Sequence, residues 1–436
     1  MNGVHPHDNK SATSKLSVEI LPINEGDEFF ITLTQHIGAP AKPLVKKGQE
    51  VKAGELIAEA GGFISANIHS PVDGVVTAID RCDYPVTTKA PCIVIKATEQ
   101  SGDYLKIDDS VQGIAEIAKA AGIVGMGGAM FPAHVKLSPP NQLDTLIING
   151  VECEPYLTCD HRAMLERSED LMSGALLIKE ALGLKRIIFG IEENKPDAAE
   201  AIRAVADDRA EVQLLPMLYP QGGEKQLIQS ATGMEVPEGK LPSELNIIVH
   251  NVSTVLAIYD AIMDRKPLIS RIVTVTGAVK TPKNLLVPLG TPLQRLIDYC
   301  GVIDFMPNIK TVRPSVILGG PMTGFAAHSL SIPSYKGMNG VLVMKQVACT
   351  PRPLPCIRCG RCVRACPMGL SPMAVENFAR NEMYEELYDW KLSSCIECSA
   401  CNYVCPSKRP LKKTFRLAKP KMAEIMKSRQ SAQETK

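Results

Sequence analysis

The chain has 436 residues, nearly three times the ~150 residues of an ordinary domain, so about two to four domains are expected. Hydrophobic residues make up 45% and charged residues 22%, which excludes disorder, collagen-like repeats and coiled coil as the main organisation. The net charge of +1 argues against nucleic-acid binding. No apolar run reaches the ~20 residues of a membrane helix, and the N-terminal residues lack the hydrophobic segment of a secretory signal. A cytosolic location is therefore expected.

Residues 40–96 contain short β segments that are interrupted by Gly and Pro. The segments 44–51, 55–58 and 70–76, with their Lys-Gly and Asp-Gly turns, predict a small all-β module. Their sequence resembles biotinyl and lipoyl carrier domains, which have the barrel-sandwich hybrid fold. The position of the modified lysine in those domains corresponds here to Phe63, so we expect the fold without the carrier chemistry.

Residues 112–265 alternate between apolar strands and helices. Strands are predicted at 145–149, 186–190 and 212–216, and helices near 162–182, 196–207, 223–231 and 252–264. This alternation predicts an α/β domain with a parallel sheet and right-handed crossovers. Residues 271–325 return to β structure, and their order of hairpin, helix and strand favours a compact β-grasp module of the SLBB-like kind.

Eight of the fourteen cysteines lie within residues 356–405, in two runs that each end in Cys-Pro. Such runs are typical of two-cluster ferredoxins, in which the fourth cysteine of each run ligates the other cluster. The first predicted 4Fe–4S cluster is therefore held by Cys356, Cys359, Cys362 and Cys405, and the second by Cys395, Cys398, Cys401 and Cys366. A pair of zinc sites is the alternative, although zinc sites usually use two CxxC pairs. A helix is expected near 373–386, between the two runs.

The remaining cysteines show no ligand spacing and are expected to be small buried hydrophobes; they are Cys82, Cys92, Cys153, Cys159, Cys300 and Cys349. The last 30 residues hold 10 Lys or Arg and 2 acidic residues. Two interpretations of this basic tail remain open: a solvated segment, or one that docks to an acidic partner or an anionic membrane surface.

A glycine-rich loop follows residue 121, with four glycines in the seven positions from Gly122 to Gly128. Glycines permit positive φ and a close approach of the backbone to a flat ring or a phosphate. The loop matches neither the dinucleotide-binding nor the P-loop pattern. Lys136 follows shortly after it and is a candidate counter-charge for a phosphate.

The stretch Gly122–Lys136 resembles the flavin-binding loop of the NADH-binding subunit of respiratory complex I. Asn149 and the segment Glu152-Cys153-Glu154-Pro155 resemble a second flavin-lining segment of that family, and the segments starting at Tyr219 and Asn251 resemble two more. Together with the modules before and after, the chain resembles the RnfC family, whose members are subunits of the Rnf electron-transport complex.

This resemblance implies non-covalent FMN, with an NAD(H) site on its exposed face. The residues that would line FMN are Gly125, Gly127, Gly128, Lys136, Asn149, Glu152, Gly223, Asn251 and Thr254. Phe131 would stack near the nicotinamide or adenine, and Glu154 would hydrogen-bond the nucleotide. Glu224 is a further candidate, because its segment aligns with the family in two ways. Met126 and Met130 depart from the family, which has Arg and Gly at these places.

The resemblance also implies the domain organisation. Residues 1–100 would form the barrel-sandwich hybrid, 101–267 the FMN/NAD(H)-binding α/β domain, 268–335 the β-grasp module, 336–410 the two-cluster ferredoxin-like α-helical domain and 411–436 the basic tail. The expected fold class is thus multidomain α/β.

The implied function is that of a peripheral NADH-oxidoreductase subunit on the cytoplasmic face of the membrane. It would pass electrons between NAD(H) and partner subunits, namely integral-membrane subunits and the iron–sulfur subunit that accepts ferredoxin electrons. Because the flavin performs the chemistry, no side chain is expected to act as acid, base or nucleophile. Two alternatives remain: a stand-alone cobalamin reductase of the same architecture, and a non-enzymatic, cluster-bearing adaptor. The direction of electron flow and the transported ion do not follow from the sequence.

Overall fold

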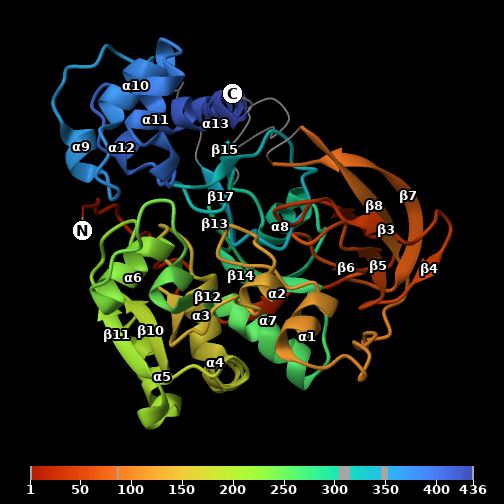
Figure 1. The fold of residues 1–436 in the computed structure, drawn as a ribbon. Helices are drawn as coiled ribbons and strands as arrows, with labels where there is room; N and C mark the ends of the chain where they lie inside the picture. The colour runs from red at the N-terminus through yellow and green to blue at the C-terminus, as the bar shows by residue number, and fades with distance from the viewer. Residues whose placement is uncertain (1, 86–87, 304–314, 345–351, 435–436) are drawn as a thin grey trace.

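The computed structural model describes residues 2–85, 88–303, 315–344 and 352–434. Four bodies follow one another along the chain (Figure 1). We call them the barrel domain (residues 28–97), the parallel-sheet domain (114–263), the mixed-sheet domain (270–344 with residues 18–20) and the cysteine domain (352–434). None of the helices in these described ranges is long and apolar enough to cross a membrane.

The barrel domain contains two antiparallel sheets around a buried aliphatic core. One sheet has the order β2 (Glu28–Thr32), β8 (Lys89–Ala97), β7 (Gly74–Asp83) and β4 (Glu50–Val51), and the other β3 (Lys42–Pro43), β5 (Leu56–Glu59) and β6 (Ile68–His69). Inward-facing side chains such as Ile31, Ile57 and Ile95 are fully buried between the sheets. Phe63 lies in the turn between β5 and β6 and is 79% exposed.

The parallel-sheet domain is built on four parallel strands. Their order is β11 (Glu211–Leu215), β10 (Arg186–Glu192), β9 (Thr145–Gly150) and β12 (Ile247–Asn251). The sequence predicted the first three strands but not β12. The helices are α1 (Ile114–Ala120), α2 (Ala133–Lys136), α3 (Cys159–Glu166), α4 (Ser168–Leu182), α5 (Pro196–Ala206), α6 (Glu224–Thr232) and α7 (Val252–Met263), with short 3-10 turns at Asp207–Arg209 and Pro242–Leu245.

Helices cover both faces of this sheet. Residues of α1, α4, α5 and α7 share one apolar cluster with the sheet, while Leu227 and Ile228 of α6 pack with Ile147 and Ile188 in another. Because parallel strands run in the same direction, their carboxyl ends meet at one edge. The segments that follow β9, β11 and β12 therefore lie together there.

The mixed-sheet domain has the strand order β1 (Val18–Ile20), β14 (Lys283–Pro288), β13 (Ser270–Gly277), β17 (Gly340–Met344), β15 (Ser315–Leu318) and β16 (Phe325–Ala326), with helix α8 (Leu293–Cys300). This sheet takes in strands on both sides of the predicted range 268–335. β1 pairs with β14 from the N-terminal segment, and β17 lies between β13 and β15. β1 has only three residues and is defined by its pairing with β14, whereas β17 is a five-residue apolar strand that was not predicted.

The cysteine domain contains α9 (Arg361–Ala365), α10 (Pro372–Arg380), α11 (Tyr384–Asp389), a 3-10 turn at Leu392–Ser394, α12 (Ala400–Tyr403) and α13 (Leu411–Glu434). The expected helix near 373–386 is thus split into α10 and α11. The segment predicted as a separate basic tail is α13, which packs against α10 and α11 (Figure 1). Its apolar residues Leu411, Phe415, Ala418 and Met422 are buried in that contact, so the solvated-tail interpretation is wrong for its first half.

A buried lysine joins three of the bodies. Lys336 is fully buried, and its Nζ donates hydrogen bonds to the carbonyls of Asn67 and Gly122, each at 2.6 Å. Its backbone N–H donates to Oε1 of Gln35 at 3.1 Å. A residue of the mixed-sheet domain therefore holds the barrel domain against the start of the glycine-rich loop.

Burial lowers the pKa of Lys336 from 10.5 to about 7. Between these values the unfolded chain binds a proton that the folded chain does not, so stability is lost as the pH falls from about 10 towards 7. We expect the free energy of unfolding, measured by urea denaturation and circular dichroism, to rise from about pH 7 to about pH 9, with a contribution from Lys336 of at most about 1.4 kcal/mol per pH unit. Lys336→Met should lack this component, whereas exposed Lys47→Met should retain it. Equal slopes in both variants would contradict the assignment.

Candidate functional site: a glycine-lined sheet edge joined to a cysteine cavity

The glycine-rich loop lies against the start of α7, at the carboxyl edge of the parallel sheet. The backbone N–H of Met126 donates to Oγ1 of Thr254 at 2.9 Å. A Cβ added to Gly127 would lie 3.3 Å from Cβ of Asn251, whereas one added to Gly128, which has a φ of 118°, would meet no atom within 4 Å. The loop thus follows the end of β12 closely and leaves an open glycine face.

Candidates from other segments meet at the same edge. Nζ of Lys136 lies 2.7 Å from Oε1 of Glu224 and 3.2 Å from the carbonyl of Val249. Nδ2 of Asn149 donates to the carbonyl of Gly222 at 2.9 Å, and Gly223 is the residue before α6. The predicted loop, the end of β9 and the starts of α6 and α7 are therefore brought together, as parallel topology requires.

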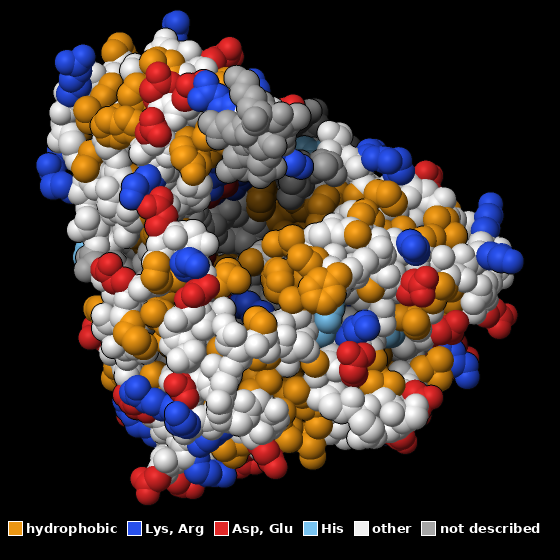
Figure 2. All heavy atoms as spheres, viewed as in Figure 1, with side chains coloured by type: hydrophobic (Ala, Val, Ile, Leu, Met, Phe, Trp, Pro, Cys, Tyr) orange, Lys and Arg blue, Asp and Glu red, His pale blue; other side chains and the backbone are white. Residues whose placement is uncertain are grey.

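This edge fits a flavin phosphate and a flat ring. The N-termini of α6 and α7, of 9 and 12 residues, present backbone N–H groups that favour an anion. Lys136 adds a partly exposed cation, with 35% of its side chain accessible. A glycine face without Cβ atoms permits close approach of a planar group. In Figure 2 hydrophobic side chains gather in the middle of this side of the molecule, beside a hollow.

Asn251 and Glu152 are turned towards α3 and α7. Oδ1 of Asn251 accepts from the N–H of Ser253 at the start of α7, and its Nδ2 donates to Asp160 at 2.7 Å. Glu152, whose side chain is 3% exposed, accepts from the N–H of Asp160 at 2.8 Å. These side chains stabilise the helix starts that border the site; a direct contact of either with FMN stays a prediction.

Glu154 is turned towards the mixed-sheet domain. Its carboxylate accepts from the backbone N–H groups of Thr323 at 2.8 Å and Met322 at 3.1 Å. Gly320 lies beside it, and a Cβ there would come to 2.1 Å from Oε2 of Glu154, which explains why a glycine is needed in this turn. Phe131 is partly buried, and its carbonyl accepts from the N–H of Gly125 at 2.8 Å.

Sequence patterns did not reveal three buried polar residues around this edge. Nζ of Lys10 donates to the carbonyls of Glu152 at 2.8 Å and Glu154 at 3.0 Å, and so fixes the backbone between the two glutamates. Asp160 binds Asn251 and Ser253, and burial raises its pKa to about 6. Gln221 is fully buried, and neither polar atom of its side chain has a partner in the described structure. No motif or spacing marks these residues.

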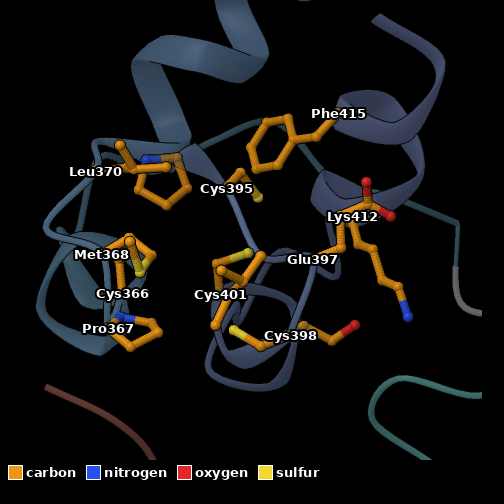
Figure 3. A pocket seen from close by; sticks show the side chains of 13 residues that line it. Cys366, Pro367, Met368, Leu370, Cys395, Glu397, Cys398, Cys401, Lys412 and Phe415 are labelled. Atoms are coloured by element: carbon orange, nitrogen blue, oxygen red, sulfur yellow. The ribbon is translucent and has the colours of Figure 1, made fainter. Parts of the chain in front are cut away.

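The cysteines expected to hold the second cluster line one cavity, which encloses about 380 Å³ of empty space, part of it open to solvent. Figure 3 shows Cys366, Cys395, Cys398 and Cys401 around it, with Met368, Leu370, Phe415 and Lys412 in the wall. Cys366 and Cys398 are buried. Of the first set, Cys356 and Cys359 are exposed, and Cys362 and Cys405 are half-buried.

The donor chemistry fits iron–sulfur clusters. All eight cysteines of the two runs are free thiols, and thiolates are the usual ligands of such clusters. Among the described residues, which include all eight, no three His, Cys, Asp or Glu converge closely enough for a single metal ion.

The other cysteines behave mainly as small hydrophobes. Cys82, Cys92, Cys159 and Cys300 are buried and Cys153 is half-buried; Cys349 lies outside the described residues.

Tyr219 connects the sheet edge with the cysteine cavity. Its hydroxyl donates to the carbonyl of Cys398 at 2.8 Å and lies 3.3 Å from Oε1 of Glu154. Burial, with Glu154 nearby, raises its pKa, so the hydroxyl stays protonated and able to donate. Tyr219, Met322 and Cys398 also share an apolar cluster with Val4 and Ala400. The parallel-sheet, mixed-sheet and cysteine domains therefore meet directly beside the second ligand set.

Comparison with known families agrees with this arrangement. The chain matches the RnfC barrel sandwich hybrid domain over residues 1–100, the Nuo51 FMN-binding domain over 118–260, the SLBB domain over 272–326 and the 4Fe-4S dicluster domain over 355–409. The expected fold class is confirmed, and FMN and two 4Fe–4S clusters are the cofactors of these domains.

Two curated relatives cover most of the chain. The C subunit of the proton-translocating ferredoxin:NAD(+) oxidoreductase complex of Clostridium ljungdahlii is 44% identical over 403 residues, 88% of this chain and 85% of that protein. The Na(+)-translocating counterpart of Acetobacterium woodii is 37% identical over 96% of this chain and 95% of that protein. A solved NAD+-reducing [NiFe]-hydrogenase is 20% identical, with a TM-score of 0.46 over 72% of this chain and 53% of that one. With its four domain matches and the two curated relatives, the chain belongs to the RnfC family, the C subunits of ion-translocating oxidoreductase complexes.

Proposed function

We propose that the chain passes electrons between NAD(H) and partner subunits of an ion-translocating Rnf complex, by way of FMN and two 4Fe–4S clusters. The partners are the integral-membrane subunits and the subunit that exchanges electrons with ferredoxin. The chain would bind peripherally, on the cytoplasmic face of the membrane.

One observation carries this proposal: the glycine-lined sheet edge and the cysteine cavity belong to one connected structure. Tyr219, two residues before Gln221 and four before Gly223, reaches the carbonyl of Cys398 at 2.8 Å. The flavin-type site is thus held in fixed relation to the ligands of a cluster. Such a fixed arrangement is what electron transfer between two bound cofactors requires.

Bound FMN would exchange a hydride with NAD(H) and pass electrons singly to the clusters. The chain's own residues would bind FMN and orient it. Lys136 and the starts of α6 and α7 would hold the phosphate, and Gly125, Gly127 and Gly128 would face the ring. Asn149 and Glu224 would border the phosphate side, Phe131 would face the nucleotide, and Asn251, Thr254 and Glu152 would support the loop. Glu154 would face the nucleotide only after its contact with Thr323 is rearranged.

The exposed Cys356 and Cys359 and the basic face of α13 suit the partner side of the molecule. An exposed ligand set is accessible to an external donor or acceptor. The basic residues of α13 that are exposed, such as Lys413 and Lys421, favour contact with an acidic partner or with anionic lipid.

An anaerobic NADH titration of the purified chain, loaded with FMN and clusters and followed by visible absorbance, tests this function. We expect the flavin absorbance to bleach first and the cluster absorbance next. If both cofactors are bound and NADH bleaches neither, the chain is not the NADH-oxidising subunit, and the adaptor alternative is favoured.

Lys136→Met should weaken FMN binding about ten-fold or more. A charge-assisted hydrogen bond contributes about 1.5–3 kcal/mol, and about 1.4 kcal/mol corresponds to a factor of ten. Flavin fluorescence on dilution measures the dissociation constant. The control is Lys185→Met, which removes an exposed cation paired with Asp144 at the opposite edge of the same sheet. Equal FMN affinity in the two variants would show that Lys136 does not contribute to FMN binding.

Cys359→Ala should remove only the cluster predicted to be held by Cys356, Cys359, Cys362 and Cys405, which we call the exposed cluster. We expect about half of the iron to be lost, one of two reduced-cluster signals in electron paramagnetic resonance spectra to vanish, and NADH to reduce FMN as before. Onward transfer to the partner subunit should fail. Transfer at the wild-type rate in this variant would rule out the exposed cluster as the exit point.

A further inference from the structure

The turn Gly320–Thr323, which follows β15, is held from two sides by opposite charges. On one side the carboxylate of Glu154 accepts from the N–H groups of Met322 and Thr323. On the other, Nζ of Lys412 donates to the carbonyls of Met322 at 3.1 Å and Thr323 at 3.0 Å. The backbone N–H groups of this short turn thus bind a carboxylate from the parallel-sheet domain, and its carbonyls bind an amino group from α13.

The stem of Lys412 lines the cavity that contains Cys366, Cys395, Cys398 and Cys401. In Figure 3 its side chain extends along the wall of this cavity and ends away from the cysteines. Its backbone N–H is also held, by Oδ1 of Asn402 at 2.8 Å. The position of the amino group relative to the cavity is therefore fixed at both ends of the residue.

Two cations of α13 that lie near this cavity but do not line it differ from Lys412 in their partners. Arg416 and Lys419 both bind the carboxylate of Glu397, at 2.7 and 3.1 Å. Lys412 donates to two neutral carbonyls. Within the described ranges, no carboxylate oxygen lies within ion-pair distance of its Nζ. Burial lowers the pKa of Lys412, as does the nearby Arg416, whereas Glu154, Glu397 and Cys398 favour its charged form. The stem of Lys412 therefore lies in the cavity wall, and its amino group is fixed at the adjacent turn, where no carboxylate of the described ranges lies within ion-pair distance.

A cluster gains one negative charge when it accepts an electron, and its potential depends on nearby charge, hydrogen bonding and solvent exposure. In a cavity with an apolar lining such as Met368, Leu370 and Phe415, water screens a neighbouring charge only weakly. A cation fixed beside such a cavity stabilises the reduced form of the cluster in it. The first ligand set is more exposed and is not part of this cavity.

We propose that Lys412 is a positioning residue that raises the reduction potential of the cluster held by Cys366, Cys395, Cys398 and Cys401, and that the turn Met322–Thr323, braced by Glu154, fixes it for this task. The inference rests on the proposed function only for the presence of the clusters. It makes the cluster beside Tyr219 easier to reduce than it would be without this cation.

The test is a redox titration of the full-length chain, loaded with both clusters and followed by electron paramagnetic resonance. Lys412→Gln keeps a donor for the carbonyls and removes the charge. We expect the equilibrium constant for reduction of this cluster to fall about ten-fold, which is a midpoint lower by about 59 mV for one electron. The cluster held by Cys356, Cys359, Cys362 and Cys405 should keep its midpoint. Lys412→Arg should restore the midpoint of the cluster beside Lys412.

Lys413→Gln is the matched control, since Lys413 is the next residue, carries the same charge and is exposed. Equal midpoints in Lys412→Gln and Lys413→Gln would overturn the proposal, as would an equal shift of both clusters. Loss of the cluster in both Lys412→Gln and Lys412→Arg would also overturn it, by assigning Lys412 a purely structural role. Failure of the proposed function has a different signature: the wild-type chain would then bind no reducible pair of clusters.

Discussion

The approach of Glu154 to the backbone of the turn Gly320–Thr323 is the contact on which the relation of the domains depends. A carboxylate can accept from two adjacent N–H groups only if no side chain intervenes, and Gly320 provides that space. The same turn receives Lys412 from α13. Removal of this contact would leave the half-buried carboxylate of Glu154 without two of its donors at the domain interface.

Lysines that donate to backbone carbonyls recur at the junctions of this protein. Lys10 holds the segment between Glu152 and Glu154, Lys336 holds the base of the glycine loop, and Lys412 holds the turn beside the cysteine cavity. A lysine amino group has several N–H donors and can satisfy carbonyls of segments that belong to no common sheet or helix. Such contacts explain how irregular segments around the site keep a defined position.

The sequence predicted those parts of the site whose chemistry lies in local spacing. The two cysteine runs identify ligands and their exchange between clusters, because the spacing of a cluster motif is set within about ten residues. The four glycines after residue 121 likewise mark a loop of close backbone approach. The strands β9, β10 and β11 were recognisable from short apolar runs, whereas β12, β1 and β17 were missed. β12 and β17 contain apolar runs of the same kind, at residues 247–249 and 341–344, that were not recognised, whereas β1 is three residues long and is defined by its pairing with β14.

The sequence by itself thus determined the cofactor classes and the order of the folded modules, and it predicted the eight cluster ligands. Only the tertiary structure decided where the glutamates point: Glu152 towards α3 and Glu154 towards Thr323. It also decided that the expected tail is a packed helix, and that Tyr219 and Lys412 join the flavin-type edge to one particular ligand set. The reason is physical. Ligand spacing is a property of neighbouring residues, whereas the direction of a charged side chain is decided by partners that other segments bring to it, as Thr323 is brought to Glu154 from 169 residues away.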